Sequence, residues 1–352
     1  MNSEIKIGKF KVGPSHPPFI IAEMSGNHGG SLEKALNIVR AVAKTGAQCL
    51  KLQTYTAETM TLPLSTGDFY IDDKKSLWHG SNLFDLYKKA HTPWDWHKPI
   101  FNLANELGLV AFSTPFDETA VDFLESLHVP AYKVASFENT DHKLIRKVAK
   151  TGKPMIISTG MAELHEISES VKVARDAGCK DLILLKCTSS YPASPAESNL
   201  RTIPALAQNF QCQSGLSDHT LGMGAAVASV ALGGTVIEKH FIDTDELETV
   251  DSAFSLTTLD FKKMVDDTKT AWESLGSVSF GPSAAEKDSL RFRRTLYCAK
   301  DVKKGERFTP ENVRAIRPGF GLPVKFYEQV VGRTAAKDIK TGERMSWDLI
   351  GL

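Results

Sequence analysis

The segment SLEKALNIVRAVAKTGAQCLKLQ, residues 31–53, contains the structural unit that recurs through most of the chain. Ser31 is suited to cap a helix, and apolar residues then recur with helical spacing at Ala35, Leu36, Val39, Val42 and Ala43. Gly46 can adopt the left-handed conformation that often follows a helix, and the strand-like segment 49–53 (CLKLQ) comes next. The segment therefore predicts an amphipathic helix that leads directly into a buried strand.

The same unit recurs along the chain and predicts the fold class. Strands are expected at residues 19–23, 49–53, 109–114, 131–136, 154–159, 182–187, 214–218 and 236–240. Strands that alternate with helices form a parallel sheet covered by those helices. Eight such units in about 250 residues match an α/β (β/α)₈ barrel, or TIM barrel. A doubly wound sheet is the competing fold, but no G-x-G-x-x-G motif follows the first strand.

The domain organisation follows from a change in the sequence pattern near residue 281, where the repeated helix and strand units give way to a loop-like stretch and then to short apolar segments separated by turns. We expect a barrel domain at 1–280, a linker at 281–290 and a small domain of short β elements at 291–352. The chain has 42 basic and 42 acidic residues, so its formal net charge is zero, which argues against a nucleic-acid partner. Residues 291–352 hold 14 basic and 7 acidic residues, a net of +7, and residues 1–290 therefore carry −7.

The sequence also indicates the compartment. It has no run of about 18 apolar residues, so no membrane association is expected. The first residues, Met1–Lys6, lack the apolar core of a signal peptide. Five cysteines form no C-x-x-C pair, which favours free thiols in a reducing cytoplasm.

Polar residues occur at the end of every predicted strand. They are Glu23; Lys51 and Gln53; Ser113 and Thr114; Lys133, Ser136 and Glu138; Ser158 and Thr159; Lys186, Thr188 and Ser189; Ser217, Asp218 and His219; Glu238 and His240. A single serine at such a place usually caps the next helix. Eight polar strand ends together predict an active site, because the carboxyl ends of the strands form the catalytic face of a (β/α)₈ barrel.

Two lysines and two histidines of this set suggest the chemistry. Lys51 and Lys133 lie within apolar strands, where they can form a structural ion pair, bind an anionic ligand or form a Schiff base. His219 and His240 end neighbouring strands and could share a divalent metal ion with a carboxylate or water. HExxH and cysteine zinc motifs are absent. The residues alone favour a metal-dependent lyase or aldolase with an anionic substrate.

Ordered motifs in residues 21–30 (IAEMSGNHGG), 50–54, 113–116, 131–138, 157–161, 187–192, 215–220 and 237–241 resemble those of the sialic acid synthase family. Residues 303–306, 317–321 and 339–343 resemble its small antifreeze-like (SAF) domain. The resemblance implies a TIM barrel followed by an SAF domain. It also implies a transferase reaction in which phosphoenolpyruvate (PEP) condenses with an N-acetylated hexose to a nine-carbon 2-keto acid, with release of phosphate.

The resemblance implies a role for each matching residue. The PEP-binding residues would be Lys51, Thr114, Lys133, Ser136, Ser158, Ser189 and Ser217. The sugar-binding residues would be Glu23, Asn27, Gln53, Tyr191, Asp251 and Arg317, and the catalytic residues Glu138, Glu23 and Lys133. His219 and His240 would hold a divalent ion, Mn²⁺ in the first place, with Mg²⁺ or Co²⁺ as alternatives. The family also implies a homodimer in which the SAF domain of one subunit caps its partner's active site.

Three segments indicate which sugar is used. Ser189 replaces the usual asparagine, the loop 248–255 reads ETVDSAFS, and residues 77–87 form an insert. These features resemble the pseudaminic acid branch of the family, whose sugar is 2,4-diacetamido-2,4,6-trideoxy-L-altrose and whose product serves flagellin glycosylation or surface polysaccharides. An aromatic wall of Trp78, Tyr87 and Phe254 would suit that sugar. The alternatives are an N-acetylneuraminate or legionaminate synthase and a non-catalytic sugar-binding protein.

Overall fold

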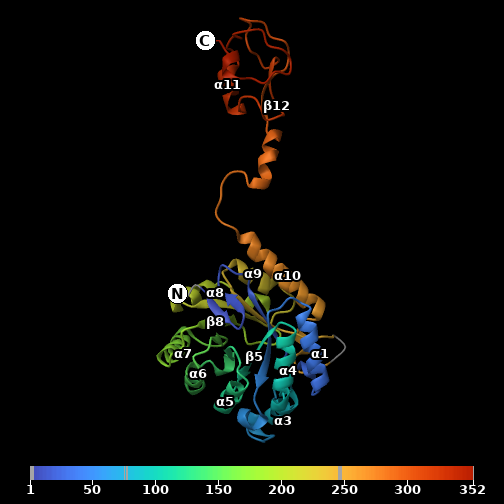
Figure 1. Ribbon diagram of the computed structural model, residues 1–352, viewed down its shortest axis with the longest axis vertical. Helices are drawn as coiled ribbons and strands as arrows, with labels where there is room; N and C mark the ends of the chain where they lie inside the picture. The colour runs from blue at the N-terminus through green and yellow to red at the C-terminus, as the bar shows by residue number, and fades with distance from the viewer. Residues whose placement is uncertain (1–3, 75, 77, 245–247, 352) are drawn as a thin grey trace. The chain divides into compact units, whose positions relative to one another are not determined.

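The computed structural model describes residues 4–74, 76, 78–244 and 248–351. The first three residues and Leu77, the first residue of the predicted insert, lie outside the described residues. The chain forms two compact units, Met1–Gly276 and Ser277–Leu352 (Figure 1). None of the helices in the described part of the chain is both long and apolar enough to cross a membrane.

The first unit is a closed barrel of parallel strands, as predicted. Within the described residues its eight strands follow the order β10-β3-β4-β5-β6-β7-β8-β9. Their bounds are β3 Phe19–Glu23, β4 Cys49–Thr54, β5 Val110–Pro115, β6 Tyr132–Val134, β7 Met155–Ser158, β8 Leu182–Cys187, β9 Gln213–Asp218 and β10 Val236–His240. All eight coincide with predicted strands to within a few residues, and the residues of each are almost entirely buried in the barrel.

Strand β6 is shorter than predicted. The expected strand 131–136 ends at Val134, and Ser136–Glu138 form a 3₁₀ turn, η3. Because the chain turns here, Ser136 and Glu138 belong to the loop at the carboxyl end of the barrel and not to its wall.

Helices follow the strands and surround them (Figure 1). Their bounds are α1 Leu32–Ala43, α2 Ala57–Met60, α3 Leu83–Ala90, α4 Trp94–Glu106, α5 Glu118–Ser126, α6 His142–Ala149, α7 Leu164–Asp176, α8 Thr202–Phe210, α9 Gly224–Ala231 and α10 Thr258–Leu275. Helix α1 begins as predicted, because the Ser31 Oγ accepts a hydrogen bond from Lys34 N at 3.3 Å. Gly46 adopts the expected positive φ of 86° before β4.

A β-hairpin precedes the barrel and was not among the predicted elements. Strands β1 (Ile5–Ile7) and β2 (Phe10–Val12) pair in antiparallel fashion. At Gly8, in the turn, a Cβ would lie 2.7 Å from Cγ2 of Val110, the first residue of β5. The hairpin therefore covers the amino ends of the strands and leaves the carboxyl ends for the site.

The second unit has its own small core. Strands β11 (Thr295–Cys298) and β12 (Val313–Ile316) pair in antiparallel fashion, and α11 spans Tyr327–Val330. The buried residues are Leu296, Cys298, Val302, Phe308, Val313, Val330, Ala335, Ile339, Met345 and Leu349. The 3₁₀ helix η6 (Ala284–Phe292) takes up most of the segment predicted as a linker.

Candidate active site

A cavity opens at the carboxyl ends of the barrel strands. Eleven of the sixteen predicted site residues line it: Glu23, Lys51, Gln53, Thr114, Lys133, Ser136, Ser158, Tyr191, Ser217, His219 and His240. The other residues of its wall are Phe116, Ala135, Phe137, Cys187 and Glu238. Side chains far apart in the sequence meet here because alternate residues of each parallel strand point into the barrel.

Two lysines and two glutamates form the charged centre of the cavity. The Lys51 ammonium forms an ion pair with Glu23 Oε2 and lies 3.8 Å from Glu238 Oε1. The Lys133 ammonium lies 3.5 Å from the same Glu238 oxygen. All four side chains are buried, so the two positive charges are balanced by two negative ones inside the protein.

Burial and charge act against each other in this cluster. Burial would lower the pKa of Lys51, but Glu23 and Glu238 outweigh it and raise that pKa above its usual value. Burial lowers the pKa of Lys133, which Glu238 only partly offsets. Glu238 keeps a lowered pKa, because the two ammonium groups outweigh the cost of its burial. The cluster therefore keeps Lys51 protonated and Glu238 ionised beside the cavity.

Hydroxyl groups surround the lysines. Lys51 Nζ donates to Thr114 Oγ1 at 3.1 Å, and Ser217 Oγ donates to Glu238 Oε1 at 3.2 Å. Ser136 Oγ accepts from Gly160 N at 3.1 Å. A Cβ at Gly160 would lie 2.2 Å from Ser189 Oγ, so the glycine leaves the space into which that serine fits.

Several buried polar atoms of this region have no hydrogen-bond partner. They are Ser158 Oγ, Glu138 Oε2, Glu238 Oε2 and His240 Nδ1. An unpaired buried polar atom costs about 1–3 kcal/mol. Four of them around one cavity indicate that a polar ligand completes the site.

The two histidines lie side by side, with ring centroids 5.4 Å apart. His219 Nδ1 lies 3.0 Å from Thr188 O, which orients its ring. Burial holds the pKa of His240 well below its usual value, so this imidazole is neutral, the form that binds metals. His240 Nδ1 also lies 3.9 Å from Asp251 Oδ2.

These residues fit a divalent ion in which the protein supplies only part of the coordination. Throughout the described chain, no group of three or more His, Cys, Asp or Glu side chains is arranged to hold a metal. The pair of imidazoles, one with an unpartnered nitrogen, would supply two ligands. The remaining ligands of an ion would have to come from solvent or substrate.

Glu138 does not line the cavity but lies at its edge, in η3. It is half-buried, and burial raises its pKa to about 7 despite the opposing effect of Lys133. A carboxyl group with that pKa can exchange a proton near neutral pH.

The predicted sugar residues outside the cavity wall have different surroundings. Asp251 is buried and accepts a hydrogen bond from Ser25 Oγ. Asn27 was expected to contact the sugar, but its amide nitrogen donates to Phe241 O at 2.9 Å and to Ser255 Oγ at 2.8 Å. Its amide oxygen accepts from Thr249 Oγ1. Asn27 therefore holds the loop that carries Asp251 and uses its polar atoms to do so.

The three predicted wall aromatics separate into two groups. Trp78 and Phe254 both lie near Tyr191, with ring centroids 6.1 and 5.2 Å from it. Tyr87 packs on Tyr55 at 5.8 Å instead.

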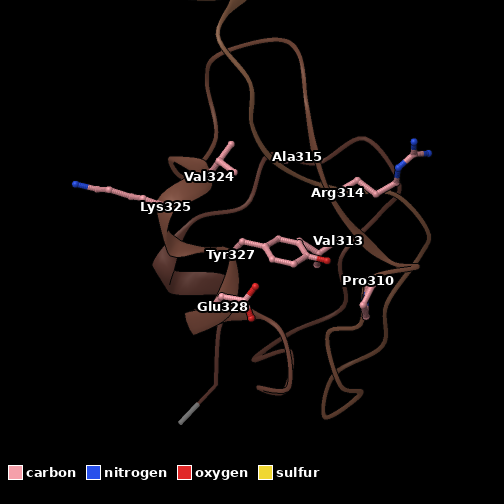
Figure 2. Close-up of a pocket in the computed structure, with 8 residues that line it drawn as sticks. All are labelled: Pro310, Val313, Arg314, Ala315, Val324, Lys325, Tyr327 and Glu328. Atoms are coloured by element: carbon pink, nitrogen blue, oxygen red, sulfur yellow. The ribbon is translucent and has the colours of Figure 1, made fainter.

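Arg317 belongs to the second unit and is not among the residues that the barrel strands bring together. The second unit has a pocket of its own, which Tyr327 lies across (Figure 2). Arg314, Lys325, Glu328 and apolar residues make up the rest of its wall. The predicted site residues are absent from that wall.

Of the five wall residues that were not assigned a role from the sequence, two have ionisable side chains. Glu238 contacts both lysines, and Cys187 Sγ lies 3.8 Å from His219 Nδ1. Glu238 was visible as a polar strand end, two residues before His240 on β10. Strand alternation, which puts residues 238 and 240 on the same face, is the signal that could have identified it.

The fold and cavity define a class of protein: a (β/α)₈ barrel whose catalytic face presents lysines, hydroxyls and histidines to an anionic substrate. Residues 38–280 match the model of the NeuB family, and residues 293–350 match that of the SAF domain. The chain therefore belongs to the NeuB family and carries an SAF domain at its carboxyl end.

Individual relatives extend along nearly the whole chain. It is 43% identical to the pseudaminic acid synthase of Campylobacter jejuni, over 97% of this chain and 98% of that one. It is 42% identical to the pseudaminic acid synthase of Helicobacter pylori, over 94% and 97%. Among solved structures, it resembles the N-acetylneuraminic acid synthetase of Leptospira borgpetersenii, with a TM-score of 0.72, 29% identity and coverage of 82% and 96%.

Proposed function

We propose that this protein condenses PEP with 2,4-diacetamido-2,4,6-trideoxy-L-altrose to form pseudaminic acid and phosphate. The observation that carries the proposal is the cavity in which two buried lysines, four serine and threonine hydroxyls and two histidines converge. The lysines and hydroxyls suit the phosphate and carboxylate of PEP, which are anionic acceptors of hydrogen bonds. The two relatives named pseudaminic acid synthase support the choice of sugar.

In the proposed reaction, carbon 3 of PEP attacks the aldehyde carbon of the open-chain sugar. A water molecule adds at carbon 2, and phosphate leaves by cleavage of its bond to that carbon. Lys51 and Lys133 hold the anionic groups of PEP and compensate their charge. Glu138, whose pKa is about 7, stabilises positive character at carbon 2 as a carboxylate or receives the proton of the added water.

The proposal includes a divalent ion, Mn²⁺ in the first place and Mg²⁺ or Co²⁺ as alternatives. His219 and His240 would hold it, and the unpartnered Nδ1 of His240 supports this assignment. A bound divalent ion would polarise a carbonyl oxygen as a Lewis acid.

The proposal also includes a homodimer in which the SAF domain of one subunit covers the site of its partner and brings Arg317 to the sugar. Exposed apolar side chains on the loops after β6, β7 and β9 support a cover: Phe137, Met161 and Leu221 are each about 60% exposed. The charges of −7 and +7 on residues 1–290 and 291–352 favour such docking.

Mixing inactive Lys133→Met and Arg317→Ala subunits should restore activity, because one site of the mixed dimer is complete. Failure to restore activity in a mixed dimer would contradict the shared site.

The cytoplasm is the proposed place of action. All five cysteines are buried free thiols, as is usual in a reducing compartment.

One assay tests the reaction. Purified protein is incubated with PEP, Mn²⁺ and either the diacetamido sugar, the legionaminate precursor or N-acetylmannosamine, and phosphate release and product mass are measured. Turnover of N-acetylmannosamine without turnover of the diacetamido sugar would replace the proposal with the N-acetylneuraminate alternative. Sugar binding without metal and without phosphate release would instead identify a non-catalytic sugar-binding protein.

A further inference from the structure

We infer that Trp78 is a positioning residue that selects the sugar, because it holds both Tyr191 and the loop of residues 249–254 in place. The inference rests on the proposed function, since it concerns the sugar of that reaction. It assigns this role to a residue that lies outside the barrel strands and outside the cavity wall.

Trp78 makes two contacts with the mouth of the site. Its indole N–H donates to the carbonyl oxygen of Val250 at 3.3 Å. Its ring centroid lies 6.1 Å from that of Tyr191, with the planes tilted by 51°. The side chain is only half-buried and comes from the segment between α2 and α3. Both contacts therefore go to elements that carry predicted sugar residues, and not to the barrel core.

The loop that Trp78 holds is anchored on its other side by η1 (Ser25–His28). Asn27 exchanges hydrogen bonds with Thr249 and Ser255, and Ser25 donates to Asp251. At Gly26 a Cβ would lie 2.5 Å from Val250 Cγ2, so the loop packs directly against this turn. Residues 249–255 are thus held from one side by the opening motif and from the other by Trp78.

A continuous line of rings runs from Trp78 to the two histidines. Tyr191 lies 4.4 Å from His219 and 5.2 Å from Phe254, and Phe254 lies 4.9 Å from His240, all between ring centroids. The lysines contact none of these rings in the described ion pairs and hydrogen bonds. A change at Trp78 should therefore disturb the aromatic side of the site and spare the charged side.

Such a wall suits a sugar with apolar substituents. Aromatic faces bind methyl groups and planar amides well and leave hydroxyl groups without partners. An acetamido-deoxy sugar offers acetyl methyls and a carbon-6 methyl in place of a hydroxyl. We therefore expect Trp78 to favour the diacetamido sugar over N-acetylmannosamine.

The test is steady-state kinetics of the wild-type protein, Trp78→Phe and Trp78→Ala with PEP, Mn²⁺ and each of the two sugars. Trp78→Ala should raise the KM for the diacetamido sugar about tenfold, because a hydrogen bond and a ring contact are both lost. It should leave the KM for PEP within about twofold and reduce the preference between the two sugars. Trp78→Phe keeps the ring and should raise the sugar KM by about threefold.

Trp272→Phe is the matched control, because its indole N–H also donates to a carbonyl oxygen, that of Pro14 at 3.0 Å, but from α10. It should leave both KM values and the sugar preference unchanged. An unchanged sugar KM and preference in Trp78→Ala would overturn the inference. So would an equal rise in both KM values with a lowered melting temperature, which is the result of a purely structural role.

The wild-type protein separates this inference from the proposed function. If it turns over only N-acetylmannosamine, the proposed sugar is wrong, and the Trp78 series is then measured with that sugar. If it turns over neither sugar, the series is measured as the dissociation constant of each sugar by calorimetry. An unchanged KM in the first case, or an unchanged dissociation constant in the second, for Trp78→Ala overturns the positioning role.

Discussion

Two groups of buried charges meet on β10, where Glu238 and Lys239 are neighbours: a closed pair, Lys239 with Asp218, and an open cluster, Glu238 with Lys51 and Lys133. Lys239 Nζ contacts Asp218 Oδ2 at 2.7 Å and Thr220 O at 2.6 Å, while Asp218 Oδ1 accepts two hydrogen bonds from Thr220. One residue earlier on β10, Glu238 contacts Lys51 and Lys133, but its Oε2 is buried without a partner.

The difference follows from strand alternation. Residues 238 and 240 point into the barrel and line the cavity, whereas residue 239 is absent from the cavity wall. A buried pair with all its hydrogen bonds satisfied is a structural ion pair. A cluster of charges that retains unsatisfied atoms beside a cavity is ready for a ligand. A charged residue in an apolar strand therefore indicates a functional site only when that residue is known to lie on the face of the strand that lines the cavity.

The largest effect should come from removing a charge of the open cluster. Lys133→Met should lower kcat/KM for PEP about 1000-fold, because a cation beside the reacting anion is lost. Its melting temperature should fall less than that of Lys239→Met, because Glu238 keeps Lys51 as a nearby cation and burial raises the pKa of Glu23, which can take up a proton. Phosphate release and thermal unfolding measure the two outcomes. Near-normal activity would place Lys133 outside the reaction.

The closed pair should respond in the opposite way. Lys239→Met leaves Asp218 buried without its cation, which should cost about 3–5 kcal/mol of unfolding free energy. The kcat/KM of the folded protein should stay within about threefold, as denaturant titration and kinetics on one sample can establish. Lost activity at full stability would show that the two groups of charges do not differ as described.

The histidine beside the open cluster should have the next effect. If the proposed metal site is correct, His240→Ala should lower metal-dependent activity about 100-fold or more, because one of its two proposed imidazole ligands is lost. Calorimetric titration with Mn²⁺ should show weaker binding, while the melting temperature of the apoprotein changes little. Unchanged Mn²⁺ affinity would remove His240 from the metal site.

The smallest effect concerns Glu138 at the edge of the cavity. Its pKa of about 7 means that the carboxylate predominates above that pH. If the carboxylate is the active form, kcat/KM should rise about tenfold between pH 6 and pH 8. Glu138→Gln should lose this rise. If Glu138→Gln shows the same dependence of kcat/KM on pH as the wild-type protein, Glu138 is not the group that controls it.

The same pKa also affects stability. Between about pH 4.5 and 7 the Glu138 carboxyl keeps its proton in the folded protein but loses it in the unfolded protein, so this group should lower the free energy of unfolding as the pH rises through that window.

Much of the fold could be predicted from the sequence, because local signals specify it. The eight predicted strands are present, and Ser31 and Gly46 adopt the conformations expected of them. The hairpin β1–β2 escaped prediction because its three-residue strands are too short for a period to be recognised. Strand β6 ended early because the polar residues Ser136 and Glu138 lie in a turn.

The candidate site was only partly predictable. Strand ends and motifs pointed to Lys51, Lys133, His219 and His240, which the barrel brings into one cavity. Local sequence patterns did not show that Asn27 holds a loop through Thr249 and Ser255, or that Tyr87 packs on Tyr55. Those contacts join segments up to 228 residues apart.

The sequence by itself determined the order of strands and helices and the polar groups at the strand ends, because spacing and capping act over a few residues. Only the tertiary structure decided which buried charged groups have all their polar atoms paired and which keep unpaired atoms, because the pairing partners come from other strands. Barrel closure places β10 beside β3, so that the last strand and the first complete one charged cluster.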